Sequence, residues 1–393
     1  MRAAELVLLL AVALGVYTYV GYPAVLKLLS LLRRPRVSPR SPSRGRGDAL
    51  PRVSIVLPVY NEAAVIAATL ERILGVDYPA DRRQILVVSD ASTDGTDAIV
   101  AQFAGRGVAL LRVPQRQGKT AAENAARPLL TGDIIINTDA SVRIDTAAIR
   151  ALVEAFDDTV GVASARDVSV TNLADTSNGG EGTYVGYEMG IRALETAVDG
   201  IVGASGCLYA IRSELHRLPV PDALSRDFAA ALTAREHGFR AVSVPQAICY
   251  VPRGRSLHHE YRRKVRTITR GLATLASKRG LLNPFQYGRF AWMLASHKVC
   301  RWLVPWAAVA ALGALVPLAL TFDWARLMLA AAGVVLGLAG LGWLWPGSGA
   351  RILTLPAYAV AGNVAVLQAW LRLFTGRAAP VWEPTRRDAI QTS

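Results

Sequence analysis

Four long uncharged stretches constrain the fold of this chain more than any other feature. Each contains 20 or more residues, and they cover residues 6–26, 302–322, 327–350 and 352–371. A helix of that length, at about 1.5 Å per residue, spans the roughly 30 Å hydrocarbon core of a bilayer. The first stretch is too long for the apolar region of a cleaved signal peptide, which has roughly 7–15 residues. The pattern therefore predicts a transmembrane anchor at residues 1–32 and C-terminal transmembrane helices at residues 302–374.

A basic linker at residues 33–50 sets the expected orientation. Basic loops beside membrane helices stay cytoplasmic, so we expect an outer N-terminus and residues 51–290 in the cytosol, in a multi-pass protein of the cell inner (plasma) membrane. A nucleic-acid arm is the alternative for this linker. Its position beside the anchor and its lack of aromatic residues favour membrane lipids as the partner, with no nucleic acid. The basic residues are Arg33, Arg34, Arg36, Arg40, Arg44 and Arg46.

A second basic region covers residues 253–301, where twelve Lys and Arg residues stand against one acid, Glu260. Interleaved apolar residues predict amphipathic helices lying on the cytoplasmic membrane surface. The tail at residues 375–393 creates a conflict. Three C-terminal crossings would place it outside, but its arginines favour the cytosol, so one late stretch could be re-entrant or shallow. Those arginines are Arg377, Arg386 and Arg387.

Residues 51–252 alternate short β-branched runs with helical patterns. This alternation predicts an α/β domain in which helices cover a buried, mostly parallel sheet. The expected strands include 53–59, 83–89 and 134–138, and the helices include 62–74 and 226–237. Three scattered cysteines, Cys207, Cys249 and Cys300, exclude a disulfide framework or a zinc cluster. His216, His258 and His259 lack metal-ligand spacing, and we interpret them as surface residues.

Acidic residues follow three of these expected strands, where ligands bind in open parallel sheets. Asp90 could accept hydrogen bonds from a base or ribose, and Asp139 is a natural oxygen ligand for a divalent cation. Lys119 follows Gly118 at an expected helix start and offers charge and N–H groups to a phosphate. Helix capping is the alternative for such acids, and it is the better interpretation of Ser92 and Asp94.

Seven segments in this order resemble the membrane-anchored family 2 glycosyltransferases of GT-A (Rossmann-like) fold, related to hyaluronan, poly-N-acetylglucosamine and cellulose synthases. The resemblance covers most of the chain. The segments are PVYNE (58–62), SDASTDGT (89–96), GKTAAENAA (118–126), TDAS (138–141), GASGCLYAIR (203–212), SRDFAAALTAREHGFRAV (225–242) and RRKVRTITRG (262–271).

The resemblance implies a role for each matched residue. Asp227 would be the catalytic base, and Ser205 and Gly206 would lie on the acceptor side. Asp139 and Ser141 would hold Mg²⁺ or Mn²⁺, although the usual second carboxylate of the metal motif is missing. Its donor would be a nucleotide sugar, UDP-linked, bound by Pro58, Tyr60, Glu62, Asp90, Lys119, Asp139 and Arg266.

These roles predict an inverting glycosyltransferase that acts on an envelope glycan or a lipid-linked acceptor at the cytoplasmic membrane face. The motif that processive synthases carry as QxxRW reads here from Arg263 to Thr267, without its Gln and Trp. We therefore expect one or a few added sugars. The alternatives are a processive exopolysaccharide synthase that extrudes its polymer and a non-catalytic nucleotide-sugar-binding scaffold. A transporter is disfavoured because the four apolar stretches carry no charge.

Overall fold

An eight-stranded sheet forms the centre of the structure, which is a computed structural model describing residues 1–32, 50–170, 179–252, 256–347 and 349–376. The strand order is β3-β2-β1-β4-β7-β6-β8-β5. The strands are β1 (Val53–Val59), β2 (Arg83–Ser89), β3 (Val108–Arg112), β4 (Ile134–Thr138), β5 (Arg143–Ile144), β6 (Val160–Val170), β7 (Leu208–Arg212) and β8 (Arg240–Pro252).

The N-terminal half of the sheet is parallel, because β1 pairs in parallel with β2 and β4, and β2 with β3. Every residue of β1 is buried, as expected for a strand covered on both faces. The antiparallel strand β7 joins this half to β6 and β8, which pair in parallel with each other. The predicted α/β architecture is confirmed, with two antiparallel strands, β7 inside the sheet and β5 at its edge beside β8.

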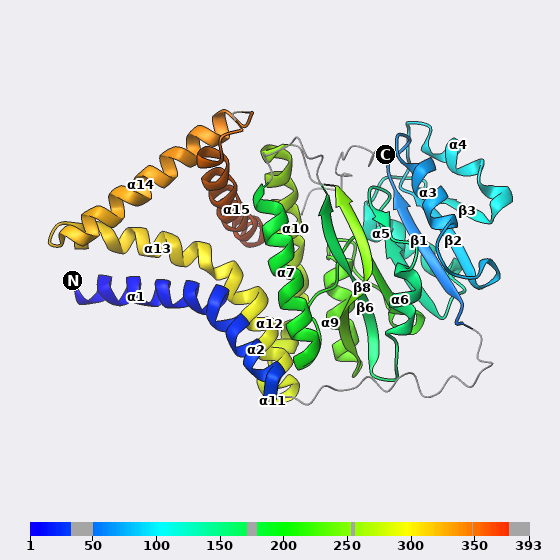
Figure 1. The fold of residues 1–393 in the computed structure, drawn as a ribbon, viewed down its shortest axis with the longest axis horizontal. Coiled ribbons are helices and arrows are strands. Elements are labelled where there is room, and N and C mark those ends of the chain that lie inside the picture. The colour runs from blue at the N-terminus through cyan, green and yellow to red at the C-terminus, as the bar shows by residue number, and fades with distance from the viewer. Residues whose placement is uncertain (33–49, 171–178, 253–255, 348, 377–393) are drawn as a thin grey trace.

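Helices cover both faces of the sheet (Figure 1). On one face, α3 (Ile66–Leu74) and α6 (Ala148–Glu154) bury leucines and isoleucines against β1 and β4. On the other, α5 (Lys119–Ala126) and α9 (Arg226–Glu236) pack through alanines. Shorter elements are α4 (Thr96–Ala101), α8 (Ser213–His216) and the 3₁₀ turns Ala80–Arg82, Ala104–Arg106, Arg127–Leu129 and Arg279–Leu282.

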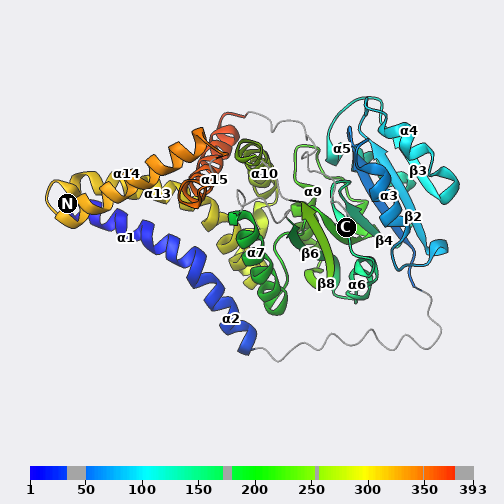
Figure 2. The ribbon, with the colours of Figure 1, turned by 45° about the horizontal axis from the view of Figure 1, so that its top comes forward.

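Long apolar helices extend away from the sheet at the other end of the molecule (Figures 1 and 2). Within the described parts of the chain, four helical segments are long and apolar enough to cross a membrane: Arg2–Leu32, Arg289–Ala319, Asp323–Leu344 and Arg351–Phe374. They contain α1 (Arg2–Val16), a π turn (Tyr17–Gly21), α2 (Tyr22–Leu32), α12 (Arg289–Leu294), a π turn (Ala295–Cys300), α13 (Arg301–Ala319), α14 (Asp323–Leu344) and α15 (Arg351–Phe374).

Helices α7 (Gly179–Val198) and α10 (Leu257–Ser277) lie between the sheet and these apolar helices (Figure 1). A buried polar network ties α7 to its neighbours: Tyr22 Oη donates to Glu195 Oε1 at 2.5 Å, and His297 contacts both Glu195 and Glu188. After α10, the short α11 (Pro284–Tyr287) leads into α12. The α/β domain and the apolar helices therefore share one packed junction.

Two elements differ from the sequence prediction. Helix α3 begins at Ile66, four residues later than expected, and the thirteen-residue strand β8 was not predicted. The sequence pattern did not indicate β8 because it contains Pro245, and a proline removes a ladder hydrogen bond and argues against an interior strand. The pairing of β8 with β6 shifts register at this point, between Val244 and Ile248, and the irregularity accommodates the proline.

Candidate active site

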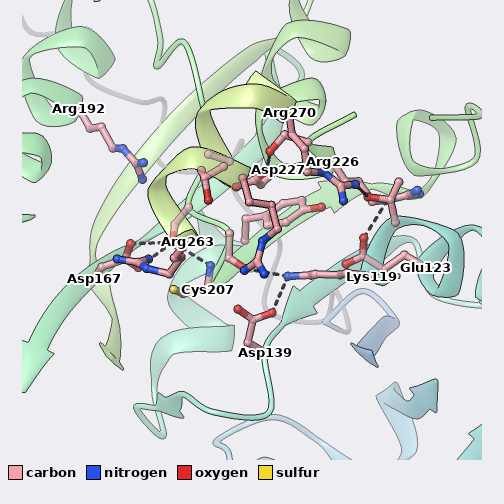
Figure 3. A pocket seen from close by; sticks show the side chains of 18 residues that line it. Lys119, Glu123, Asp139, Asp167, Arg192, Cys207, Arg226, Asp227, Arg263 and Arg270 are labelled. Carbon is pink, nitrogen blue, oxygen red and sulfur yellow. Dashed lines mark hydrogen bonds and ion pairs between the residues drawn. The ribbon is translucent and has the colours of Figure 1, made fainter. Parts of the chain in front are cut away.

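A pocket of about 310 Å³ opens between the C-terminal end of β4, α5, α9 and α10 (Figure 3). Six predicted site residues line it, from segments spread over the whole α/β region. Acids and cations alternate around its wall, so the pocket is built for a charged and hydroxylated ligand. The six residues are Lys119, Asp139, Ser205, Gly206, Asp227 and Arg266.

Lys119 forms an ion pair with Asp139 across the floor of the pocket. Lys119 Nζ lies 2.5 Å from Asp139 Oδ1 and donates to the carbonyl of Gly206 at 3.1 Å. Burial opposes the charge of Lys119, but the carboxylates of Asp139 and Glu123 outweigh it and raise its pKa. Lys119 is therefore a cation at neutral pH.

Asp90 positions the turn that carries Lys119. Its carboxylate is fully buried and accepts hydrogen bonds from the N–H groups of Gln117 and Gly118, both at 2.8 Å. Gly118 has φ 97°, in the region that favours glycine, and α5 starts directly after it. Asp90 thus holds the backbone turn from which the side chain of Lys119 projects. Its predicted contact with the nucleotide sugar stays a prediction.

Asp227 lies in the first turn of α9 and points into the pocket (Figure 3). Ser225 Oγ donates to Asp227 Oδ1 at 2.5 Å. The N–H of Ser225 donates to Thr274 Oγ1 at 2.9 Å, which fixes this turn to α10. A β-carbon added to Gly206 would stand 2.8 Å from Asp227 Oδ2. The carboxylate is therefore held in one place with little space around it.

The expected acceptor-side residue Ser205 is hydrogen-bonded to a second carboxylate of the pocket, that of Asp167 on β6. Ser205 Oγ lies 2.7 and 2.8 Å from the two carboxylate oxygens of Asp167, to which it donates its hydrogen. The N–H of Ser205 donates to Ser164 Oγ at 2.8 Å. This loop is consequently rigid beside Asp227, and Asp167 lines the pocket with it.

Helix α10 forms the wall of the pocket nearest to the apolar helices, with Arg263, Arg266, Thr267 and Arg270 (Figure 1). Arg263 Nε donates to Glu260 at 3.0 Å, and Arg270 Nη2 donates to Thr120 Oγ1 at 2.8 Å. Arg270 thereby connects α10 to α5. This segment offers cations to the pocket, and Thr267 brings no aromatic ring.

A buried ion pair, missed in the sequence analysis, supports the pocket from behind. Arg226 Nε lies 3.6 Å from Glu123 Oε2, and Glu123 is fully buried. Although Arg226 precedes Asp227 in the sequence, its guanidinium turns to Glu123 and Asn124. Burial raises the pKa of Glu123. A signal existed, because Glu123 lies one helical turn after Lys119 and shares its face.

Five predicted site residues lie outside the pocket wall, near the ends of β1, β2 and β4. The ring of Tyr60 stacks under Arg116, whose guanidinium carbon is 3.8 Å from the ring centroid. Asn61 and Ala91, which follow β1 and β2, have positive φ values of 52° and 57°. Such backbone at neighbouring strand ends is typical of a binding edge. The five residues are Pro58, Tyr60, Glu62, Asp90 and Ser141.

His216 corrects one interpretation. It is 2% exposed rather than a surface residue, and its Nε2 lies 3.4 Å from Arg226 Nη2. Burial, with the charge of Arg226 next, lowers its pKa well below the usual value, so the ring is neutral. Through this contact His216 connects α8 to Arg226 at the start of α9.

The fold and part of the sequence are similar to those of known proteins. Residues 54–205 match the model of the family described as Glycosyl transferase family 2. The solved mannosyltransferase PcManGT from Pyrobaculum calidifontis, in complex with GDP-Man and Mn²⁺, has the same fold. The TM-score is 0.70 at 23% identity, over 94% of this chain and 99% of that one. The chain therefore has the GT-A fold of nucleotide-sugar-dependent transferases.

Curated relatives match parts of the chain. The beta-monoglucosyldiacylglycerol synthase of Nostoc sp. is 28% identical over 169 residues, 42% of this chain and 36% of that protein. The dodecaprenyl-phosphate galacturonate synthase of Rhizobium johnstonii is 31% identical over 119 residues, 28% of this chain and 35% of that protein. The chain spans about a quarter to two fifths of the length of the first curated relatives. The match to a glycosyltransferase family therefore rests on the family 2 domain at residues 54–205.

Proposed function

We propose that this chain transfers a sugar from a nucleoside-diphosphate sugar, UDP-linked as the resemblance implies, to an acceptor hydroxyl with inversion at the anomeric carbon. One observation carries the proposal. The carboxylate of Asp227 and the Lys119–Asp139 ion pair line one pocket. Lys119 and Asp139 belong to the family domain, and Asp227 belongs to the segment after it. A base for an acceptor and a cation for a leaving diphosphate therefore share one site.

In the proposed reaction, the acceptor oxygen attacks the anomeric carbon as the bond from that carbon to the diphosphate oxygen breaks. Asp227 takes the hydroxyl proton, and the nucleoside diphosphate leaves with the bonding electron pair. Lys119 and Arg266 would stabilise the charge that develops on the leaving group. The confined Asp227 carboxylate meets the need of a general base for a fixed position near the attacking oxygen.

The residues fit a divalent cation that arrives with the donor. Asp139 supplies one carboxylate, and the described residues contain no cluster of three or more His, Cys, Asp or Glu side chains for an ion. Mg²⁺ commonly binds through one or two carboxylates together with substrate phosphates. We propose that Asp139 and Ser141 hold Mg²⁺ or Mn²⁺ in this way, and that the ion neutralises diphosphate charge when bound.

We further propose a cytoplasmic membrane face as the site of action, with three crossings. At the end of the apolar helices farthest from the α/β domain, Met1 lies beside Thr321 of the α13–α14 turn. The two ends of α15 contact the ends of α14 and α13 that lie away from this turn. Gly342, near the end of α14, packs on Leu353 near the start of α15. Trp370 Nε1, near the end of α15, donates to the carbonyl of Trp302 near the start of α13 at 3.1 Å.

These contacts support a surface position for α15. Trp302 also packs on Phe228 of the α/β domain, with ring centroids 6.3 Å apart, so this end of α13 lies at the domain. If α1–α2, α13 and α14 cross the bilayer, α15 lies along its cytoplasmic surface beside α10. The tail then returns to the cytosol, which removes the charge conflict found in the sequence.

A processive synthase is the second candidate, favoured only by the apolar helices beside the pocket. Thr267 lines the pocket where the synthases carry Trp, so a growing chain lacks that stacking surface. We propose one or a few transfers to an envelope glycan or lipid-linked acceptor. Product length after exhaustive reaction, measured by mass spectrometry, separates the two, because a high-molecular-weight polymer would contradict short products.

The proposal is tested by nucleotide release from purified full-length protein in detergent, screened over UDP- and GDP-sugars with Mg²⁺ or Mn²⁺. We expect release from one donor, stimulated by a membrane lipid extract. Absence of release with every donor, by a protein that still binds nucleotide, would favour the scaffold alternative.

A further inference from the structure

Two residues that line the pocket carry buried side-chain polar atoms without a hydrogen bond, Glu123 and Arg192. Glu123 belongs to the buried pair with Arg226. Arg192 is different, because its Nε and Nη1 make no hydrogen bond, its Nε lies 3.8 Å from Glu188 Oε1, and its side chain is 11% exposed. A guanidinium with unused hydrogen-bonding capacity in a pocket wall is suited to an anionic ligand, so Arg192 points to a ligand here.

The charge of Arg192 is poorly matched within the protein. Glu188 already accepts hydrogen bonds from Arg301 Nη1 at 2.7 Å and contacts His297 Nε2 at 2.9 Å. The carboxylate oxygens nearest to Arg192 are therefore occupied by closer partners. An anionic group of a ligand would supply what Glu188 does not, since guanidinium groups bind phosphate with strong charge-assisted hydrogen bonds.

Arg192 lies on the acceptor side of the pocket. In Figure 3 it stands away from Lys119 and Asp139, on the side of the pocket where Asp167 and Arg263 lie. The donor diphosphate is assigned to the Lys119 side, so an anion at Arg192 belongs to the other substrate. That substrate also has to present a hydroxyl to Asp227.

The position of α7 indicates from where such a substrate arrives. Ile191, directly before Arg192, and Leu194, two residues after it, pack in one cluster with Tyr22 and Leu26 of the membrane anchor. Arg192 thus sits where the pocket meets the apolar helices. A lipid in the bilayer would carry its phosphate to this level while its chains stay among those helices.

We propose that Arg192 binds the phosphate group of a lipid-linked acceptor, whose hydroxyl is presented to Asp227. This inference rests on the proposed function and narrows its acceptor to an anionic lipid. The same phosphate chemistry occurs in soluble phosphate esters, so the test separates the two sources.

Binding of two phosphate probes to the full-length protein in neutral detergent, with the donor site filled by nucleoside diphosphate and Mg²⁺, provides the test. The probes are phosphatidic acid in micelles and glycerol 3-phosphate in solution, with diacylglycerol as the uncharged control. We expect phosphatidic acid to bind, glycerol 3-phosphate to bind more weakly, and diacylglycerol to bind least.

Arg192→Gln should weaken phosphatidic acid binding by roughly 10-fold or more, and Arg192→Lys should restore part of it. Arg262→Gln, which removes an exposed arginine of α10 outside the pocket, is the matched control and should bind as the wild type does. Unchanged binding by Arg192→Gln would overturn the proposal, and equally tight glycerol 3-phosphate would overturn its lipid part.

Nucleotide affinity distinguishes the remaining cases. Arg192→Gln should bind nucleoside diphosphate with the affinity of the wild type, which also shows that it folds. Loss of nucleotide binding in this variant would contradict an acceptor-side role. A wild type that binds phosphatidic acid but turns over no nucleotide sugar would reject the proposed function and leave the Arg192 site standing.

Discussion

The carboxylate of Asp227 lies against Gly206, so closely that a β-carbon at position 206 would be 2.8 Å from Asp227 Oδ2. Real β-carbons do not tolerate such a distance, so a larger residue displaces the carboxylate. Gly206 also accepts a hydrogen bond from Lys119 through its carbonyl. One glycine thus contacts both groups to which we assign the chemistry.

Gly206→Ala should lower turnover by about 100-fold, because a base moved by about 1 Å loses its alignment with the attacking oxygen. The thermal unfolding midpoint should change little, since the end of one side chain can move. Gly105→Ala is the control, because a β-carbon there meets nothing within 4 Å. Turnover of Gly206→Ala at the wild-type rate would show that the position of Asp227 is not critical.

Asp139→Ala should remove divalent-cation dependence together with most activity, a loss of roughly 100-fold or more. The reason is that Asp139 is the acid of its segment that lines the pocket. Asp81→Ala, at a side chain that is 80% exposed, is the control. Titration of activity with Mn²⁺ and with EDTA provides the measurement, and full wild-type turnover in excess EDTA would contradict the metal assignment.

His216 should make the folded protein less stable in acid. Its pKa is lowered in the folded state, so below the usual value of about 6.5 the unfolded chain binds a proton that the native protein does not. Between pH 7.5 and pH 5.5 this difference removes about 1.4 kcal/mol. His216→Gln should flatten that part of the stability profile, measured by unfolding in detergent at several pH values. An unchanged profile would mean that His216 does not contribute.

Surface labelling tests the three-crossing topology. In a protein whose native cysteines are replaced, Ala3→Cys and Asp323→Cys should react with a membrane-impermeant thiol reagent added outside intact cells. Ser41→Cys and Thr375→Cys should be protected, because the proposed topology places the linker and the end of α15 on the cytoplasmic side. Labelling of Thr375→Cys from outside would show that α15 crosses, and reversed labelling of Ala3→Cys would invert the whole arrangement.

The sequence predicted the parts of this molecule that depend on local pattern. The buried run of β1, the Gly118–Lys119 helix start and the strand-end position of Asp139 were all readable, since each follows from neighbouring residues. The basic linker and the tail arginines, whose orientation was predicted, lie outside the described residues.

What could not be predicted depends on residues distant along the chain. The pairing of Glu123 with Arg226 and the burial of His216 arise only when α5, α8 and α9 pack together. Strand β8 was hidden because Pro245 argues locally against a strand, and pairing with β6 overrides it. Arg192 gave no signal, because a single arginine in an expected helix is normally solvated.

The central claim is that Asp227 activates an acceptor hydroxyl for attack on a nucleotide sugar. Steady-state transfer by Asp227→Asn, compared with the wild type and with the exposed control Asp158→Asn, tests it most directly. The account predicts a fall in turnover of about 10²–10⁴-fold with nearly unchanged nucleotide affinity. Wild-type turnover by Asp227→Asn would contradict it.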